Sequence, residues 1–157
     1  MGYQKLQVQR AIEVIPQDGV PVPSPSGIKR SSSNTSVVTN RLVDAAANFI
    51  SINVLPGDVI YNTTTSTSTI VMSVLNATTI VVNDDIFLAS PNAYSIYSPA
   101  TGVGPVLYVG VGGDVNVVTE GGDTVLFENV QGGTFMPVMV KEVKASFTTA
   151  QSIVALS

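Results

Sequence analysis

The 157-residue sequence contains no cysteine, no histidine and no tryptophan. Without cysteine, disulfide frameworks, thiolate metal sites and iron–sulfur clusters are excluded. Without histidine, a Ser-His-Asp or Cys-His arrangement and a histidine general base are excluded as well. An enzyme would have to use carboxylates, lysine, tyrosine or backbone amides, and we recognise no pair of carboxylates at a definable separation. The sequence therefore predicts a protein that is not an enzyme and has no catalytic, cofactor-binding or metal-binding residues.

Charge is also scarce, because only 11% of the residues are charged while 45% are hydrophobic. The N-terminal stretch MGYQKLQVQR lacks the apolar run of a signal peptide, and no run approaches the roughly 18 apolar residues of a membrane span. We therefore expect no export by the usual route and no membrane partner. A chain with so few charges must cover its surface with uncharged side chains, and such surfaces usually mark contacts between subunits. A homo-oligomer is expected.

The residue types that dominate are Val, Thr, Ser, Ile and Gly, a composition typical of strands and turns. Ile70, Met72 and Val74 share one parity, as a half-buried strand requires. Residues 42–49 are the only stretch compatible with a helical turn. Since no helical crossover is available, the sheets should be antiparallel. The sequence predicts an all-β fold, with an extended N-terminal arm followed by two small antiparallel β-sandwich or barrel modules.

Proline and glycine divide the chain into segments. Pro16, Pro21, Pro23 and Pro25 cannot donate to a ladder, so residues 1–36 should form an extended, Pro-rich arm that belongs to neither core. Runs of β-branched and aromatic residues separated by turn signals predict a small inserted β-module at residues 37–98. The composition PATGVG indicates a linker at residues 99–104. Residues 105–157 then form a C-terminal β-module of about five strands.

Basic residues are confined to the two ends of the sequence. Residues 42–140 contain eight acidic side chains and neither lysine nor arginine. One interpretation is that the N-terminal cations keep the arm soluble; the other is that the arm docks onto an acidic surface. Nucleic acid is not expected, because the basic residues are spread out and have no interleaved aromatic platform. The residues expected to anchor the arm are Lys5, Arg10, Pro16, Pro21, Pro23, Lys29 and Arg30.

Two Gly-Gly-Asp motifs, at residues 112–114 and 121–123, are similar to calcium-binding β-roll repeats in their nine-residue spacing. Those repeats require G-G-x-G-x-D, whereas here Asp directly follows the Gly pair. We expect hairpin turns instead, because Gly-Gly-Asp suits turns that need positive φ. Asp84 and Asp85 have no second carboxylate cluster that can be related to them, so a solvated turn is expected there.

Five motifs far apart in the sequence share their order and content with one family. They are A-I-x-V-x-P-x-D at residues 11–18, L-Y-V-G-x-G-G-D-V-x-V at 107–117, G-G-D-T-V-x-F-x-N-V at 121–130, G-T-F-x-P-V-x-V at 133–140 and T-T-A-x-x-I-x-A-L at 148–156. Together they resemble the head spike base proteins of gene transfer agents and tailed bacteriophages. The stretch between the first two motifs looks like a small β-module that recurs in phage structural proteins, and it forms an insertion in the spike-base pattern.

The resemblance implies a structural virion protein on the capsid exterior, a decoration or vertex protein made in the host cytoplasm. Its implied partners are the major capsid protein, further copies of itself in a pentamer or trimer, and a further spike or fibre protein. It carries over no catalytic residues. The alternative is a receptor- or glycan-binding module at a tail, neck or fibre, for which the available tyrosines are Tyr61, Tyr94, Tyr97 and Tyr108.

Overall fold

The computed structural model describes residues 8–102 and 104–157 of the chain. These residues form fourteen strands and no helix, so the predicted all-β fold is confirmed and the helical turn expected at residues 42–49 is not formed. In chain order the strands are β1 (Ala11–Glu13), β2 (Pro23–Ser33), β3 (Ser36–Val38), β4 (Arg41–Val43), β5 (Val59–Asn62), β6 (Thr67–Asn76), β7 (Thr79–Val82), β8 (Ala93–Pro99), β9 (Val106–Val111), β10 (Gly113–Thr119), β11 (Thr124–Val130), β12 (Thr134–Met136), β13 (Val140–Val143) and β14 (Gln151–Leu156).

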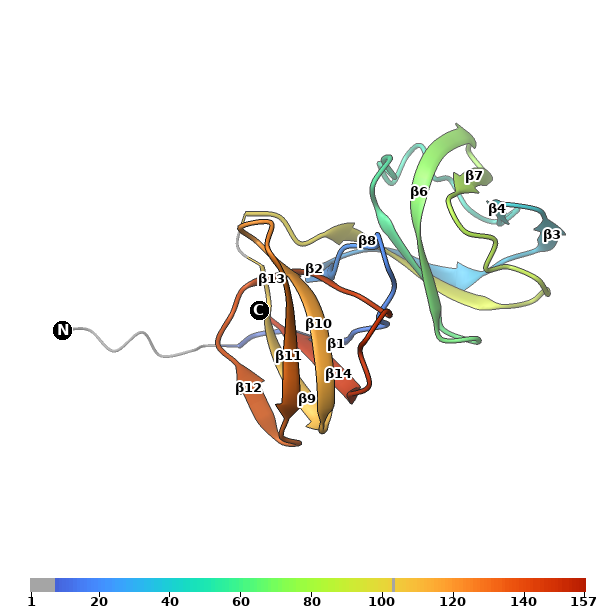
Figure 1. The fold of residues 1–157 in the computed structure, drawn as a ribbon. Coiled ribbons are helices and arrows are strands. Elements are labelled where there is room, and N and C mark those ends of the chain that lie inside the picture. Colours follow the sequence, from blue (N-terminus) through green and yellow to red (C-terminus); the bar gives the residue numbers. More distant parts are fainter. Residues whose placement is uncertain (1–7, 103) are drawn as a thin grey trace.

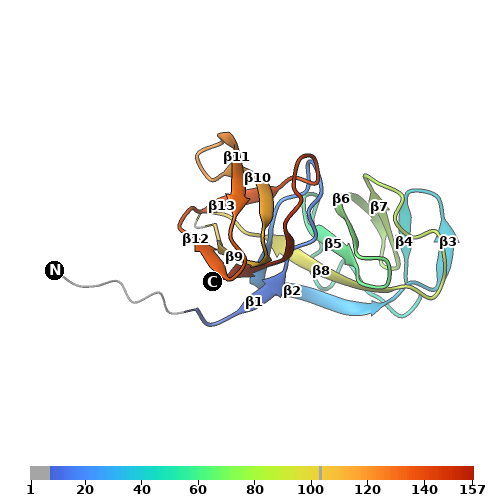
Figure 2. The same cartoon turned by 60° about the horizontal axis from the view of Figure 1, so that its bottom comes forward.

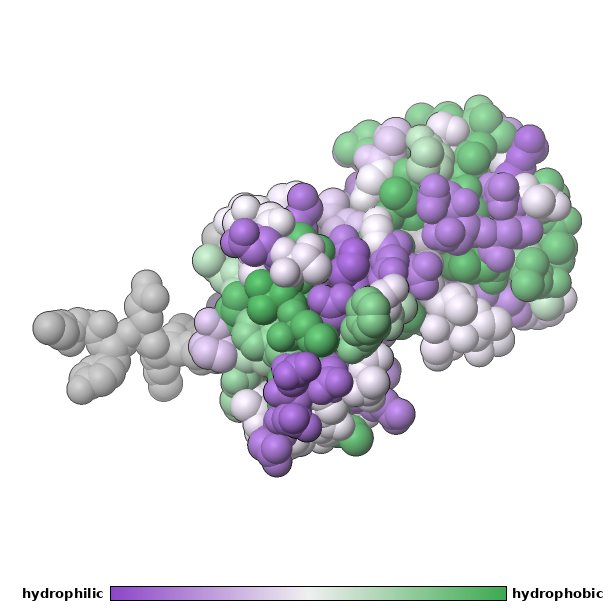
Figure 3. All heavy atoms as spheres, viewed as in Figure 1, coloured by the Kyte–Doolittle hydropathy of each residue, from purple (hydrophilic) through white to green (hydrophobic). Residues whose placement is uncertain are grey.

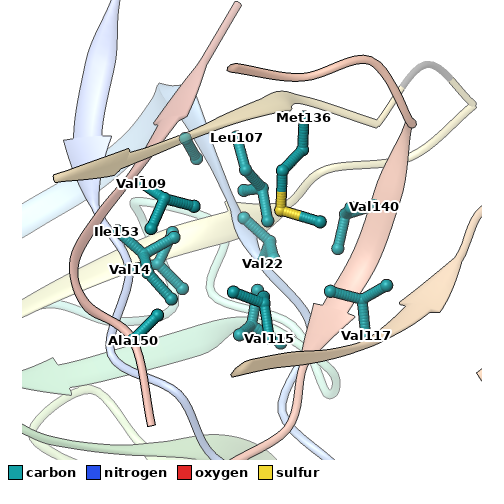
Figure 4. Packing of buried hydrophobic residues seen from close by; sticks show 12 residues of the cluster. Val14, Val22, Leu107, Val109, Val115, Val117, Met136, Val140, Ala150 and Ile153 are labelled. Atoms are coloured by element: carbon teal, nitrogen blue, oxygen red, sulfur yellow. The ribbon is translucent and has the colours of Figure 1, made fainter. Parts of the chain in front are cut away.

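The C-terminal module is a sandwich of two antiparallel sheets (Figure 1). One sheet has the order β1-β14-β9-β12 and the other the order β11-β10-β13. Alternate residues of β9 and β10, such as Leu107 and Val109 or Val115 and Val117, are fully buried between the sheets (Figure 4). This alternation is what a two-layer sandwich requires. The core comprises Val14, Val22, Leu107, Val109, Val115, Val117, Met136, Val140, Val143, Ala150, Ile153 and Ala155.

The middle module is one seven-stranded antiparallel sheet in the order β2-β8-β5-β6-β7-β4-β3. The long strand β6 pairs with β5 through its first half and with β7 through its second half, with register shifts beside β7. Figures 1 and 2 show the sheet curling, so that its two ends enclose a core of their own. That core comprises Leu42, Ala47, Phe49, Val54, Ile60, Val71, Ile80, Val82, Phe87, Tyr94 and Ile96.

The middle module is inserted into the C-terminal module through two adjacent segments. Pro23 at the start of β2 is the register partner of Pro99 at the end of β8. The Ala100 N–H donates to the Val22 carbonyl at 3.0 Å. The chain therefore leaves and re-enters the C-terminal module at one place.

A third apolar cluster, distinct from the two cores, joins elements of both modules. Its buried members are Val20, Val59 and Tyr61, and Ile12, Ile15, Ile70 and Tyr97 pack against it. Val59 and Tyr61 belong to β5 of the middle module, whereas Ile12 lies in β1 of the C-terminal module. The two modules therefore share apolar contact where the insertion begins.

The prediction that residues 1–36 form an arm outside both cores is wrong for residues 8–36. Val14 and Val22 lie in the C-terminal core, and β1 pairs with β14. β2, with Pro23 and Pro25, pairs with β8. The prolines are tolerated because β2 is an edge strand, where a missing N–H can face away from the ladder. Residues 1–7 of the predicted arm lie outside the described residues.

The predicted module boundaries change accordingly. The middle module begins at β2 and not at residue 37, and residues 8–22 belong with residues 104–157. In the predicted linker, Gly104 is buried and a Cβ there would lie 2.8 Å from the Val140 carbonyl oxygen. That residue packs against the C-terminal module and does not act as a free joint.

Candidate interaction surfaces

Lys29, one of the predicted anchoring residues, makes its contacts within the chain. Its Nζ lies 2.6 Å from Asp58 Oδ2 and donates to the Asn53 carbonyl at 2.8 Å. The Asp58 side chain is only 4% exposed and also accepts the Leu55 N–H. The pair fixes β2 to the turn before β5, and the lysine is not offered to a partner.

Arg30 forms a second, more extensive internal network. Its guanidinium contacts Asp44 Oδ2 at 2.8 Å and donates from Nε to the Tyr94 hydroxyl at 3.0 Å. The Tyr94 hydroxyl in turn donates to Asp44 Oδ2 at 2.6 Å. Burial raises the pKa of Asp44, but the hydrogen bonds from Tyr94 and Arg30 outweigh it and hold that pKa below its ordinary value. Burial, and then the bond to Asp44, raise the pKa of Tyr94.

The acidic surface that the charge pattern predicted for the basic residues therefore lies, for Lys29 and Arg30, in the same chain. The charge pattern alone does not distinguish an intramolecular acidic partner from an intermolecular one, and this is why it predicts an anchoring role for both residues. Residues 28–33, Ile-Lys-Arg-Ser-Ser-Ser, show no alternation of apolar and polar side chains, so the sequence carries no signal of the period-2 kind that would have located this strand.

The other predicted anchoring residues are placed differently. Arg10 has an exposed side chain, and its backbone is held by two hydrogen bonds to Ser157, with N···O distances of 2.9 and 3.0 Å. Pro16 and Pro21 are half-buried, Pro21 forms an isolated bridge with Glu142, and Pro23 is buried. Lys5 lies outside the described residues. Among the anchoring cations that the structure describes, Arg10 alone is exposed.

A cleft of about 380 Å³ lies at the junction between the modules. Tyr97 and Tyr61 form part of its wall, with ring centroids 5.6 Å apart in an edge-to-face arrangement. Tyr61 is buried, which raises its pKa, and its hydroxyl accepts the Ile15 N–H at 3.3 Å. The full lining is Ile12, Glu13, Val14, Ile15, Pro16, Tyr61, Thr63, Ser66, Tyr97, Ala150, Gln151 and Ser152.

The four tyrosines considered for glycan binding do not share one platform. Tyr94 and Tyr61 are buried in the middle module, and Tyr97 is half-buried in the junction cleft. Tyr108, on β9, instead packs against Phe135 of β12 with ring centroids 5.3 Å apart. Only Tyr97 borders the cleft with an accessible ring.

The Gly-Gly-Asp motifs act as corners of the C-terminal sandwich. Residues 121–123 form the expected hairpin between β10 and β11. Residues 112–114 do not, because there the chain crosses from the sheet of β9 to that of β10. Asp114 Oδ1 accepts the Asn129 N–H at 3.0 Å, so this carboxylate links β10 to β11 at the register shift between Gly113 and Val115. Among the described residues, no three acidic side chains are grouped as a metal site would need.

Hydrophobic side chains are exposed on both modules, and Figure 3 shows such residues gathered over the face of the C-terminal module that carries β10 and β11. The most exposed are Phe147 and Leu88, at 75% and 74%. Exposed apolar surface of this kind is typical of interaction sites, and contact with other subunits stays a prediction. The exposed large hydrophobic residues are Val8, Ile28, Val37, Val38, Ile50, Leu55, Met72, Leu75, Leu88, Val111, Val125, Leu126, Phe135, Met139 and Phe147.

Comparison of the chain with protein-family models, with curated proteins and with solved structures finds no match. In the described ranges, no helix is long and apolar enough to cross a membrane.

The five motif segments come together in one module. The first, residues 11–18, contains β1, and the last, residues 148–156, contains β14. These two strands pair with Ala11 opposite Leu156 and Glu13 opposite Val154. The other three segments form the β9–β10 crossing, the β11 strand and the β12–β13 connection of the same sandwich. Motifs that the sequence separates by the whole insertion are therefore neighbours in space.

Proposed function

We propose that this chain is a structural protein of a phage-like virion, located on the capsid exterior. The C-terminal sandwich acts as the base that attaches to the major capsid shell, and the inserted module projects from that base. The observation that carries the proposal is the convergence of the five spike-base motifs into one sandwich, with β1 closing the sheet against β14.

The proposed mechanism is the burial of apolar surface between rigid modules, without chemistry. Two ion pairs of the middle module, Lys29 with Asp58 and Arg30 with Asp44, are satisfied within the chain. What remains exposed includes many large hydrophobic side chains, whose burial against other subunits is favourable at about 25 cal/mol per Å² before the costs of association. Such a protein strengthens a shell by adding interface.

The inserted module has a separate role in this proposal. It joins the base at two neighbouring strand ends, so it can be carried without interrupting the base sandwich. Its exposed Ile50 and Leu75 are available to a further spike or fibre protein. The base thus contacts the shell while the insertion contacts what lies above it.

Receptor or glycan binding is the second candidate, and the junction cleft is the observation that favours it. Tyr97 supplies an aromatic ring there, and Glu13 and Gln151 supply polar groups. Sugars bind to aromatic faces flanked by hydrogen-bonding side chains. A glycan array with the wild-type protein and Tyr97→Ala would identify this function by signal that the variant loses.

The experiment for the virion proposal uses capsids from a phage that encodes this chain, prepared with its gene deleted. Purified full-length protein is added back, and binding is measured by co-sedimentation and located by cryo-electron microscopy. We expect saturable binding at symmetry-related exterior positions and greater resistance of the shell to heating. Folded protein that leaves intact capsids undecorated, or that binds the tail alone, would contradict the proposal.

A further inference from the structure

Phe147 is presented to solvent in an unusual way. It lies in the segment between β13 and β14, with 75% of its surface exposed and with φ at 66°. A bulky residue with positive φ is a conformational outlier, which persists only where the surroundings enforce it. Phe147 therefore combines a strained backbone conformation with an exposed ring, and packing within its own module does not account for that exposure.

The segment around Phe147 is held on both sides by hydrogen bonds. The Ser146 N–H donates to Asp18 Oδ1 at 3.1 Å, and the Ser146 hydroxyl donates to the same carboxylate. The Asn116 side-chain amide donates to the Ser146 carbonyl at 2.9 Å, and the Asn116 N–H donates to Thr148 Oγ1 at 3.0 Å. Phe147 is thus a preorganised knob, so little conformational entropy remains to be lost when it binds.

An apolar groove of about 270 Å³ lies elsewhere on the same module, between β11 and β12. None of its seven lining residues is charged, and only Thr134 is polar. Phe127, Val130 and Val138 also pack on the C-terminal core, and Met136 belongs to it, so the groove is an opening into that core. The lining is Phe127, Val130, Thr134, Phe135, Met136, Pro137 and Val138.

The knob and the groove are on opposite sides of the sandwich. The sheet orders are β11-β10-β13 and β12-β9-β14-β1, so β11 and β12 form one side while β13 and β14 lie beyond the central strands. Phe147 follows β13, whereas the groove lies beside β11 and β12. The groove and the knob of one chain therefore face different neighbours.

The charges on the two sides differ. The side of Phe147 carries both signs, because Lys141 and Asp18 are exposed there and Lys144 is paired with Glu142 at 3.6 Å. The side with the groove is acidic, with Glu128 on β11 and Asp123 in the preceding turn, both exposed. Contact between the two different sides avoids placing two acidic groove sides against each other, which favours this orientation over groove-to-groove pairing.

We propose that Phe147 of one copy inserts into the β11–β12 groove of a second copy. The space suffices, since an apolar cavity of about 150 Å³ already accepts benzene. The contact is head-to-tail, because each copy uses two different surfaces, and such contacts generate a ring when the rotation closes. The inference concerns the isolated protein, and it goes beyond the proposed function by assigning the surfaces of self-association.

The test compares the full-length wild type with two variants, each with one surface altered. Phe147→Ser removes the knob. Phe135→Lys places a charge at the half-exposed rim of the groove. Leu88→Ser is the matched control, because Leu88 is equally exposed but lies in the middle module. Circular dichroism and melting temperature establish that each variant folds.

Analytical ultracentrifugation then measures the mass of each protein and of a mixture. We expect an oligomer for the wild type and Leu88→Ser, and 16.3 kDa monomers for the other two, whose affinity should fall by at least about 30-fold. Mixing Phe147→Ser with Phe135→Lys should give a dimer and nothing larger, because one intact knob and one intact groove remain.

Two outcomes would overturn the inference: a monomeric wild type, or an oligomer unaffected by Phe147→Ser. The add-back experiment on capsids separates this inference from the proposed function. A protein that forms the oligomer but never binds capsids contradicts the proposed function alone. A protein that decorates capsids but associates through other residues contradicts the inference alone.

Discussion

The two modules differ in how completely they are closed. The middle module buries large side chains such as Phe49, Phe87 and Ile60 with no exposed surface. The core of the C-terminal module consists mostly of valine and alanine, and it opens at the β11–β12 groove. Packing completes the first module within a continuous stretch of chain, whereas the second needs residues 8–22 and retains an apolar opening. An inserted module can thus be self-contained while its host is not.

They also differ in what fixes their backbone. The middle module relies on buried polar side chains, including Asp44 with Arg30 and Tyr94, and Asn34, whose side chain bonds to the backbone of Ala89 and Asn92. The C-terminal module relies on close backbone approach at glycines such as Gly110 and Gly112. Each kind of constraint leads to a substitution that should affect one module and spare the other.

The largest effect is expected from deleting residues 1–22. This removes β1 together with Val14, Val20 and Val22, and each buried valine contributes about 1.5–3 kcal/mol. The sum approaches the whole stability of a small domain. Hydrogen exchange should show the C-terminal strands unprotected while β5, β6 and β8 remain protected. Protection retained throughout β9–β14 would mean that the first segment is dispensable to the host module.

Asp44→Ala should destabilise the middle module by about 3–5 kcal/mol, because it leaves Arg30 without its buried partner. Urea denaturation followed by hydrogen exchange should locate the loss in β2–β8. Asp123→Ala is the control, since Asp123 is an exposed acidic residue of the other module, and it should change stability by less than about 0.5 kcal/mol. Equal losses for the two variants would show that the network contributes nothing specific.

Gly112→Ala should cost the C-terminal module about 1–3 kcal/mol, the usual range for overpacking. Its Cβ would lie 2.7 Å from the Val130 carbonyl oxygen and 2.9 Å from the Gly132 nitrogen, both backbone atoms. Gly121→Ala is the matched control, because its nearest neighbours would be side-chain oxygens at 3.6 Å. Thermal melts of the two variants should differ by several degrees, and identical melts would remove close approach as the reason for that glycine.

Much of this architecture can be predicted from the sequence, and each wrong prediction has a physical cause. The β-branched composition predicted the all-β fold correctly, whereas the predicted module boundaries differ from those of the structure. The prolines led to the wrong prediction of an arm outside both cores. An edge strand tolerates a missing N–H, and the sequence does not show which strands lie at an edge. The sequence does not reveal that Lys29 and Arg30 pair within the chain, because their partners Asp58 and Asp44 are distant in sequence. Phe147 and the groove were not predicted, since exposure depends on tertiary packing.

Acid should affect the middle module more than the C-terminal one. The pKa of Asp44 is lowered by bonds from Tyr94 and Arg30 despite burial, and that of Asp18 is lowered by bonds from Ser146. A lowered pKa adds stability above the ordinary value of about 3.9, and this stability is lost as pH falls through the folded value.

Melting temperatures should therefore be level between about pH 5 and 8 and fall below about pH 4, where these carboxylates become protonated. Asp44→Asn should reduce the fall in melting temperature that the middle module shows at acid pH. Asp18→Asn should have the smaller effect, because Asp18 is exposed and water screens its interactions. A larger effect from Asp18 would reverse the proposed ranking of the modules.

The smallest effect is expected from removing calcium. This experiment tests whether a bound ion, in addition to close backbone approach, stabilises the Gly-Gly-Asp corners of the C-terminal module. EDTA should leave the melting temperature unchanged, because Asp114 Oδ1 already accepts the Asn129 N–H. A ligand that binds only the folded state raises stability with its concentration, so titrating calcium into EDTA-treated protein is the sensitive measurement. A rise of several degrees that Asp114→Asn abolishes would show that this corner binds the ion, and the contrast between the modules would then include a metal.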